Sequence, residues 1–205
     1  MIIFGLATFS IFGLIGTGQF HCPNCGGDRA YEHRVARRFF TLFFVPVIPL
    51  NKVGEFVRCN TCRTRFDPAV LRQPTTAQLA AALPTGMRAI AVTMMRAGGT
   101  SEWAVNAAVD AVRRAGLPAY DAQQLWADSS QPVEAAAAPL QVLAAQLTPE
   151  ACERFLAEAV RIGLADGPLT PGEHEAIRWI AGNLGMTPAH AQGVIATVEQ
   201  SVKPS

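Results

Sequence analysis

The sequence has 205 residues, of which 50% are hydrophobic and 16% are charged, so it contains ample apolar material for a packed core and is not typical of a disordered chain. Its length fits one medium domain or two small ones. A formal net charge of +1 argues against a protein that binds nucleic acid over its whole surface.

The charge is distributed unevenly along the chain. Residues 1–72 carry nine Lys or Arg against four Asp or Glu, a net of +5, whereas residues 73–205 carry eight against twelve, a net of −4. Seven arginines of the first part could form a basic patch for nucleic acid: Arg29, Arg34, Arg37, Arg38, Arg58, Arg63 and Arg65. We consider a nucleic-acid partner the weakest of the alternatives below, because four thiolates on a zinc ion would cancel about two of these charges.

The first twenty residues carry no charged side chain, which raises the question of a membrane segment. The apolar run extends from Ile2 to Ile15, is interrupted by Gly5 and Gly13, and is shorter than the roughly 20 residues of a spanning helix. A basic residue near the start and a small-residue cleavage site, which a secretory signal requires, are not evident. The Ile, Phe and Thr content suits strands as well as a helix, so both interpretations stay open.

Four of the five cysteines form two C-x2-C pairs, Cys22 with Cys25 and Cys59 with Cys62, with 33 residues between the pairs. Such pairs are typical of a tetrahedral zinc site, and Gly26 suits the left-handed turn that follows the first pair. The separation exceeds the usual range of about 15 to 20 residues, so extra strands must lie between the pairs. Two disulfides or four free thiols are the alternative, which we do not favour because disulfides belong mainly to secreted proteins.

Four cysteine ligands would leave a zinc ion no open position for water or substrate. We therefore predict one structural Zn²⁺ and no catalytic metal. A small β-module has little core of its own, and metal binding of about 10–16 kcal/mol would supply much of its folding free energy.

The segment between the cysteine pairs includes FFTLFFVPVIPL at residues 39–50. Pro46 and Pro49 prevent a continuous helix, and twelve residues are too few to span a bilayer. We favour paired short strands that add apolar core to the ribbon. The alternative is an exposed finger that inserts, with or without residues 2–15, into a membrane surface or a partner groove.

The stretches GQFHCPNCGG, YEHRVARRFFTLFFVPVIPL, GEFVRCNTC and FDPAVL together resemble the bacterial zinc-ribbon module that is often fused to a TerB-like helical domain. The resemblance implies that the N-terminal stretch is a strand region of the ribbon. The sequence departs from the family by its unusually apolar run from Phe4 to Ile15.

The second part of the chain changes to alanine-rich, helix-forming sequence, and we place a domain boundary between residues 72 and 73. Apolar residues recur at helical spacing within residues 101–115, 150–163 and 173–184, and Cys152 falls on the apolar stripe of the second segment. We expect the three tryptophans to be core anchors: Trp103, Trp126 and Trp179.

Threonine followed by proline marks three predicted helix starts, with Thr148, Thr170 and Thr187 as N-caps. Thr170 and Glu173 also have the spacing of a capping box. A weak internal repeat is visible, with Gly116 and Gly185 in register 69 residues apart, and it predicts two copies of a helical unit.

The loop GLADGPLTPGEHEAI contains the one candidate site of this part of the chain. Asp166 and Glu173 flank a turn and could share a divalent cation, but the spacing lacks the alternating oxygens of an EF-hand. The favoured alternative is that Asp166 and Gly167 form the turn and Glu173 caps the helix.

The same loop, with FLAEAVRIGLADG before it and IAGNLGM after it, resembles the tellurite-resistance TerB family and the related N-terminal domain of the DnaJ-like co-chaperone. The resemblance covers about residues 75–200 and implies an all-helical fold. It also implies metal binding by acidic loop residues, and Asp166 and Glu173 match those positions.

The predicted fold is therefore mainly α, with an N-terminal four-cysteine zinc ribbon at residues 1–72 followed by an all-helical TerB-like bundle at residues 73–205. No catalytic arrangement or small-molecule site is evident, and we expect a cytoplasmic, non-enzymatic adaptor in bacterial stress response with a protein partner. The alternatives are a protein at the cytoplasmic face of the membrane that inserts residues 2–15 or 39–50, and nucleic-acid binding through the basic ribbon.

Overall fold

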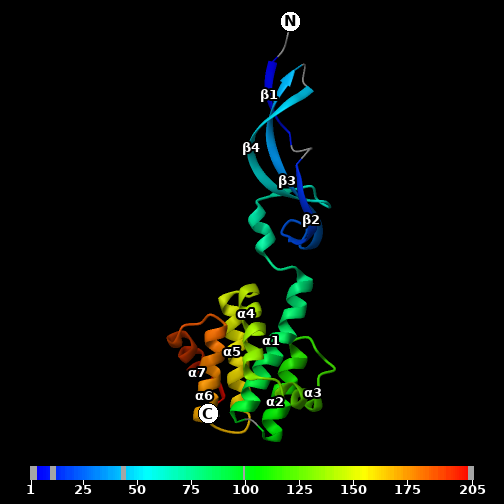
Figure 1. Ribbon diagram of the computed structural model, residues 1–205. Coiled ribbons are helices and arrows are strands. Elements are labelled where there is room, and N and C mark those ends of the chain that lie inside the picture. Colours follow the sequence, from blue (N-terminus) through cyan, green and yellow to red (C-terminus); the bar gives the residue numbers. More distant parts are fainter. Residues whose placement is uncertain (1–3, 10–12, 43–44, 99, 203–205) are drawn as a thin grey trace. The chain divides into compact units, whose positions relative to one another are not determined.

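The computed structural model describes residues 4–9, 13–42, 45–98 and 100–202. Contacts divide the chain into two compact units, Met1–Gln78 and Leu79–Ser205. Strands lie in the first unit, and the described part of the second unit is helical (Figure 1). This confirms the predicted fold class, whereas the domain limits 1–72 and 73–205 stay a prediction.

The first unit contains an antiparallel sheet of five strands, and a short 3-10 helix follows the last strand along the chain. These elements are β1 (Phe4–Phe9), β2 (Leu14–Cys22), β3 (Gly27–Leu42), β4 (Val45–Cys59), β5 (Arg65–Phe66) and η1 (Pro68–Arg72). The long strand β3 pairs with β4 on one side, and on its other side it pairs with β1 and β2 in turn. The sheet therefore has two ends along β3: β2 pairs with residues 27–34 at one end, and β1 pairs with residues 37–42 at the other (Figure 1).

Residues 4–9 of the N-terminal apolar run form β1 and pair with residues 37–42 at the end of β3. Phe4 is opposite Leu42 and Phe9 is opposite Arg37 in the register of β1 and β3. The strand interpretation is thus confirmed for residues 4–9 and 14–22, while residues 2–3 and 10–12 lie outside the described part. The prediction of paired strands is confirmed in the insert, where Phe39 is opposite Pro49; residues 43–44 lie outside the described part.

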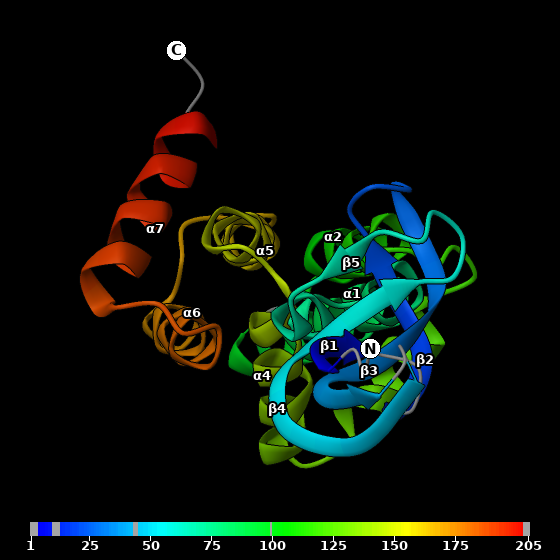
Figure 2. The same cartoon turned by 90° about the horizontal axis from the view of Figure 1, so that it is seen from above.

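Seven α-helices and one 3-10 helix follow in the described residues. They are α1 (Thr76–Ala97), α2 (Glu102–Arg114), α3 (Ala122–Ser129), η2 (Val133–Ala136), α4 (Ala137–Gln146), α5 (Pro149–Gly163), α6 (Pro171–Asn183) and α7 (Pro188–Val202). Helix α7 contacts α5 and α6, as Figure 2 shows. No helix among the described residues is long and apolar enough to cross a membrane.

The predicted threonine caps are confirmed. The hydroxyl oxygens of Thr148, Thr170 and Thr187 accept from the backbone N–H groups three residues later, and proline occupies the first helical position each time. Each cap satisfies a donor that the first helical turn would otherwise leave without a partner.

The predicted repeat corresponds to two helix pairs, α2 with α3 and α6 with α7. Gly116 and Gly185 both have positive φ, at 118° and 76°, immediately after the C-cap residue. The next N–H group in each case, from Leu117 and Met186, donates to a carbonyl five residues earlier. Such a bond satisfies a carbonyl of the last helical turn, so α2 and α6 end with the same C-terminal motif.

The main core lies in the second unit and draws buried side chains from all seven α-helices described. Cys152 is buried in it, as predicted. The prediction that tryptophans anchor the core is wrong for Trp103, which is 74% exposed, and for Trp126, which is 47% exposed. The helical period places Trp103 near the polar face of α2, with Asp110, and not with the buried Ala104.

Candidate metal centre

Both cysteine pairs lie on tight turns at one end of the sheet. Cys22 ends β2 and Cys59 ends β4, so the sheet pairing brings the two turns together although they are far apart in sequence. Residues after each first cysteine donate back to its carbonyl: Gly26 N–H to Cys22 at 2.9 Å, and Arg63 N–H to Cys59 at 3.0 Å. The register of the strands thus positions the first cysteine of each pair, and the turns position the second.

The two turns differ at the residue that follows the second cysteine. Gly26 and Arg63 both adopt left-handed backbone, with φ of 66° and 62°. Glycine adopts this conformation without steric cost, whereas an arginine there is strained by its Cβ. The glycine allowed the first turn to be predicted from the sequence, and the second turn has no such signal.

The four sulfur atoms lie within 4.8 Å of one another. Sulfurs placed about 2.3 Å from a zinc ion in a tetrahedron would be about 3.8 Å apart. The Cys22 and Cys62 Sγ atoms are separated by 3.8 Å, and all five cysteines of the chain are free thiols. The donor set and its spacing therefore fit Zn²⁺, with Cys22, Cys25, Cys59 and Cys62 as the residues that would hold it.

The thiols differ in their ionisation. The pKa of Cys62 is lowered to about 5, chiefly by a hydrogen bond with the Thr64 side chain and also by one with Asn24. Burial and hydrogen bonds with its cysteine neighbours raise the pKa of Cys25 to about 12. Because metal binding requires thiolates, we expect proton release when the cluster takes up a metal ion.

A small core surrounds the cysteine cluster. Phe20 and Val57 are buried next to Cys22 and Cys59. The Phe20 ring meets the rings of Tyr31 and Phe66 edge to face, with centroids 5.6 and 5.8 Å away. Two of the four fully enclosed residues are thus cysteines, so an ion at the cluster would stabilise the centre of the ribbon.

Asp28 follows the first cysteine turn and contacts the start of α1. Its carboxylate oxygens accept from the backbone N–H groups of Thr76, at 2.9 Å, and Ala77, at 3.2 Å. The hydrogen bond from Thr76 is the main cause of the lowered pKa of Asp28, and the one from Ala77 adds to it. A ribbon side chain therefore caps the first turn of this helix.

Part of the predicted basic patch is engaged in contacts within the ribbon. Arg34 and Arg58 both donate to the same carboxylate oxygen of Glu32, at 2.8 and 2.7 Å. The guanidinium of Arg65 lies 4.7 Å from the centre of the Phe56 ring. The ion pairs with Glu32 reduce the positive charge that the patch presents to a phosphate backbone.

The acidic loop of the second unit has the arrangement of turn and cap. Glu173 is 2% exposed, and one of its carboxylate oxygens accepts from both the N–H group and the hydroxyl of Thr170, at 2.8 and 2.9 Å. Asp166 is exposed at the preceding turn. Cation binding by these two residues stays a prediction: among the described residues, the four cysteines form the one group of three or more metal-ligating side chains.

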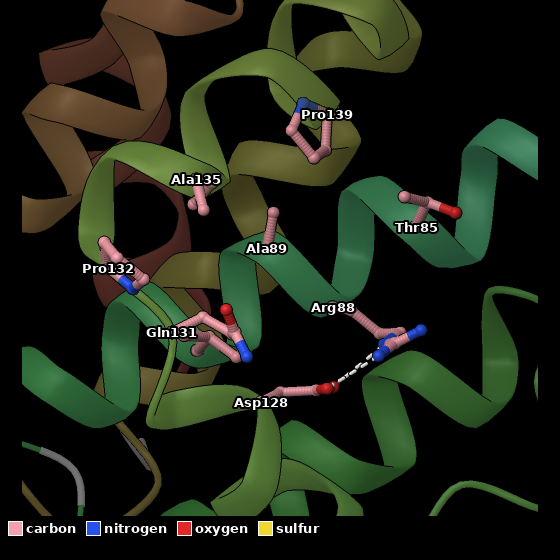
Figure 3. A pocket seen from close by; sticks show the side chains of 10 residues that line it. Thr85, Arg88, Ala89, Asp128, Gln131, Pro132, Ala135 and Pro139 are labelled. Carbon is pink, nitrogen blue, oxygen red and sulfur yellow. Dashed lines mark hydrogen bonds and ion pairs between the residues drawn. The ribbon is translucent and has the colours of Figure 1, made fainter.

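A polar cluster that the sequence did not predict lies beside a hollow of about 210 Å³ (Figure 3). The Arg88 guanidinium donates two hydrogen bonds to the Asp128 carboxylate, at 2.9 and 2.6 Å, and the Tyr120 hydroxyl donates a third, at 2.7 Å. Burial raises the pKa of Tyr120, and the hydrogen bond to Asp128 adds to this effect. Burial alone would raise the pKa of Asp128, but Arg88 and Tyr120 outweigh it and lower that pKa.

The hollow is lined mainly by small and apolar side chains from α1, η2 and α4, with Arg88 and Asp128 at one side, as the sticks in Figure 3 show. Both charges are already paired with each other. The cluster therefore joins α1 to α3 and leaves little free charge for a ligand.

The two units match known families in the same order. A zinc-ribbon family model matches residues 20–76, and the model of the tellurite resistance protein TerB matches residues 85–194. No curated protein and no solved structure matches the chain. The fold and the cysteine cluster thus define a zinc-ribbon protein with a helical domain.

The TerB match covers more than half of the 205 residues, so the chain belongs to the TerB family. The predicted fusion of a zinc ribbon to a TerB domain is confirmed.

Proposed function

We propose that this protein is a non-enzymatic adaptor of a bacterial stress response. The ribbon, stabilised by one structural Zn²⁺, and the TerB domain act through contacts with other proteins. The observation that carries the proposal is the convergence of all four sulfur atoms within 4.8 Å. A tetrahedral ion held by four cysteines has its coordination positions filled by the chain, which favours a structural role over catalysis.

The stress-response part of the proposal rests on the match to the tellurite resistance protein TerB. The arrangement of titratable side chains supports the adaptor part. Glu173 caps a helix, and Arg88 pairs with Asp128, so these polar groups stabilise the TerB domain. We propose a cytoplasmic location and sensing of metal as further parts of this role.

Growth of the native host under tellurite tests the stress-response role. Deletion of the gene should sensitise cells to tellurite, the intact chain should restore growth, and Cys59→Ser should not. Cys152→Ser is the matched control, because Cys152 is a buried cysteine outside the cluster. A deletion strain as tolerant as its parent would contradict the role.

Cross-linking in the native host, followed by purification of the intact chain, tests the adaptor role. We expect one protein in stoichiometric amount that is absent when Cys59→Ser is used. Recovery of the chain without such a protein, under tellurite and without it, would contradict the adaptor role while leaving the zinc site untouched.

A further inference from the structure

At the end of β3 away from β2, the sheet combines two apolar segments that are separate in sequence. We define the apolar blade as residues 4–9, 37–42 and 45–52, which are the paired parts of β1, β3 and β4 away from the cysteines (Figure 1). Its sequences are FGLATF, RRFFTL and VPVIPLNK. Two separate apolar segments are visible in the sequence, and the strand register joins them into one surface.

Both faces of the apolar blade carry apolar residues. Successive residues of a strand alternate between the two faces of a sheet. Phe39 and Phe40 are successive in β3 and are opposite Pro49 and Ile48 of β4. An antiparallel sheet with one solvated face shows alternating polar residues, and this pattern is missing from the blade.

The charged residues of the apolar blade are all cationic and lie at one level. Arg37 is opposite Lys52 in β4 and Phe9 in β1, and Arg38 is opposite Thr8. Asp28 and Glu32 lie in the other half of β3, opposite β2. Glu55 follows the blade in β4, and its carboxylate forms an ion pair with the exposed Lys52. The blade and Glu55 together carry a net charge of +2. Cationic residues of β3 and β4 therefore border the apolar part at this level, next to the uncharged Thr8 and Phe9 of β1.

From this placement we propose that the apolar blade docks into the interface of an anionic lipid bilayer. Phosphate headgroups would meet Arg37, Arg38 and Lys52, and each basic residue near an anionic surface contributes about 1 kcal/mol. The apolar residues beyond these cations would enter the boundary between headgroups and acyl chains.

The length and the open edges of the blade limit how deeply it can insert. Six residues of a strand extend about 20 Å, whereas one leaflet of the hydrocarbon core is about 15 Å thick. Open sheet edges are not stable in the hydrocarbon core, because their N–H and C=O groups need partners. The blade would therefore stay in the interface, where water and headgroups reach its edges, and Pro46 and Pro49 lower the number of N–H donors on β4.

A bilayer interface accounts for the blade better than a second copy of the chain. Two stacked sheets bury one face of each and leave the other two exposed, whereas lipid contacts both faces of an inserted blade. Addition of a strand at the β4 edge is disfavoured by its two prolines.

Flotation of the zinc-loaded full chain with vesicles tests the proposal. We expect binding to vesicles of equal parts phosphatidylcholine and phosphatidylglycerol, and little binding to phosphatidylcholine alone. Loss of each cation should lower the partition coefficient about fivefold, so Arg37→Gln with Lys52→Gln should lower it about 25-fold. The matched control, Arg72→Gln with Arg178→Gln, removes the same charge from exposed residues outside the blade and should change it less than about threefold.

A second variant tests the apolar part. Phe40→Ser with Ile48→Ser changes a register pair of the blade and should abolish binding while zinc content stays at one ion per chain. If it loses zinc, the comparison of the two charge variants still decides.

Three results would overturn the proposal. The first is no binding to the anionic vesicles at low salt. The second is an equal loss for both charge variants, which would mean unspecific attraction. The third is a dimer, measured by light scattering, that the Phe40→Ser and Ile48→Ser variant dissociates, because a second copy would then be the occupant. The adaptor role is tested separately by tellurite growth and cross-linking.

Discussion

The ribbon and the helical unit bury side chains in very different ways. The ribbon core around the cysteines has four buried residues, Phe20, Cys22, Val57 and Cys59. The core of the helical unit draws buried residues from all seven α-helices described. The comparison suggests different centres for ordering the backbone of the two units: a hydrophobic core in the helical unit, and in the ribbon a metal ion that the four cysteines would hold.

The largest predicted effect tests whether the ribbon depends on its metal. Cys59→Ser or removal of zinc by a chelator should unfold the ribbon, because metal binding of about 10–16 kcal/mol contributes to the folding of such sites. Hydrogen exchange followed by mass spectrometry should show loss of protection in β2–β4 and retained protection in α5 and α6. Cys152→Ser serves as the control, and equal protection of the ribbon with and without zinc would remove the contrast between the units.

The reciprocal variant acts on the hydrophobic core. Leu156→Ala removes a fully buried side chain of α5 and should lower the stability of the helical unit by about 2–5 kcal/mol. Urea unfolding followed by the helical circular dichroism signal measures this loss, and the zinc content should not change. Release of zinc by Leu156→Ala in the absence of urea would show that the two units do not keep separate stabilities.

A third variant concerns the polar cluster of the helical unit. Asp128→Asn should destabilise the protein by about 2 kcal/mol, because it weakens hydrogen bonds to a partly buried charge. The pKa of Asp128 is lowered in the folded state, so its stabilising effect is present above the ordinary carboxyl value and is lost as pH falls below about 4.

Thermal unfolding from neutral to acidic pH, followed by the helical signal, separates this effect from others. The intact chain should lose stability more steeply below about pH 4 than Asp128→Asn does. Tyr120→Phe keeps both charges and should cost about 1 kcal/mol. Parallel pH profiles of the intact chain and Asp128→Asn would refute the assignment.

The smallest predicted effects distinguish the two cysteine turns. Gly26→Ala should destabilise the ribbon by about 1 kcal/mol, because Cβ disfavours its positive φ. Arg63→Gly should stabilise it by up to about 1 kcal/mol, since it relieves the same strain. Competition for zinc with a chelator measures both, and a loss of affinity in Arg63→Gly would assign this arginine a role beyond its backbone.

Local signals in the sequence predicted the elements that depend on neighbouring residues. The C-x2-C pairs and the cap of Thr170 with Glu173 need three or four consecutive positions, and the structure has both turns and the capping box. The family resemblances added the order of the two domains. Metal binding by the cysteines is supported by their geometry, and the ion itself stays a prediction.

Features that depend on distant pairing were not predictable. The pairing of β1 with residues 37–42 depends on strand register, for which the uniformly apolar sequence gives no unique choice. The Arg88 and Asp128 pair joins residues 40 apart and has no motif. The exposure of Trp103 was mispredicted because the size and apolarity of tryptophan favour a buried position. Its place on the polar face of α2 indicates an exposed position instead.

The hydrogen bond from Thr76 to Asp28 joins residues 48 apart, and the ribbon cysteines Cys22 and Cys62 are 40 apart. The helix caps of the second unit join residues three apart. Closing a longer loop costs more chain entropy before any contact forms, so high contact order slows folding. We therefore expect the helices to form early during refolding. The ribbon should fold later, when it binds its metal ion, and the hydrogen bonds from the start of α1 to Asp28 should form last.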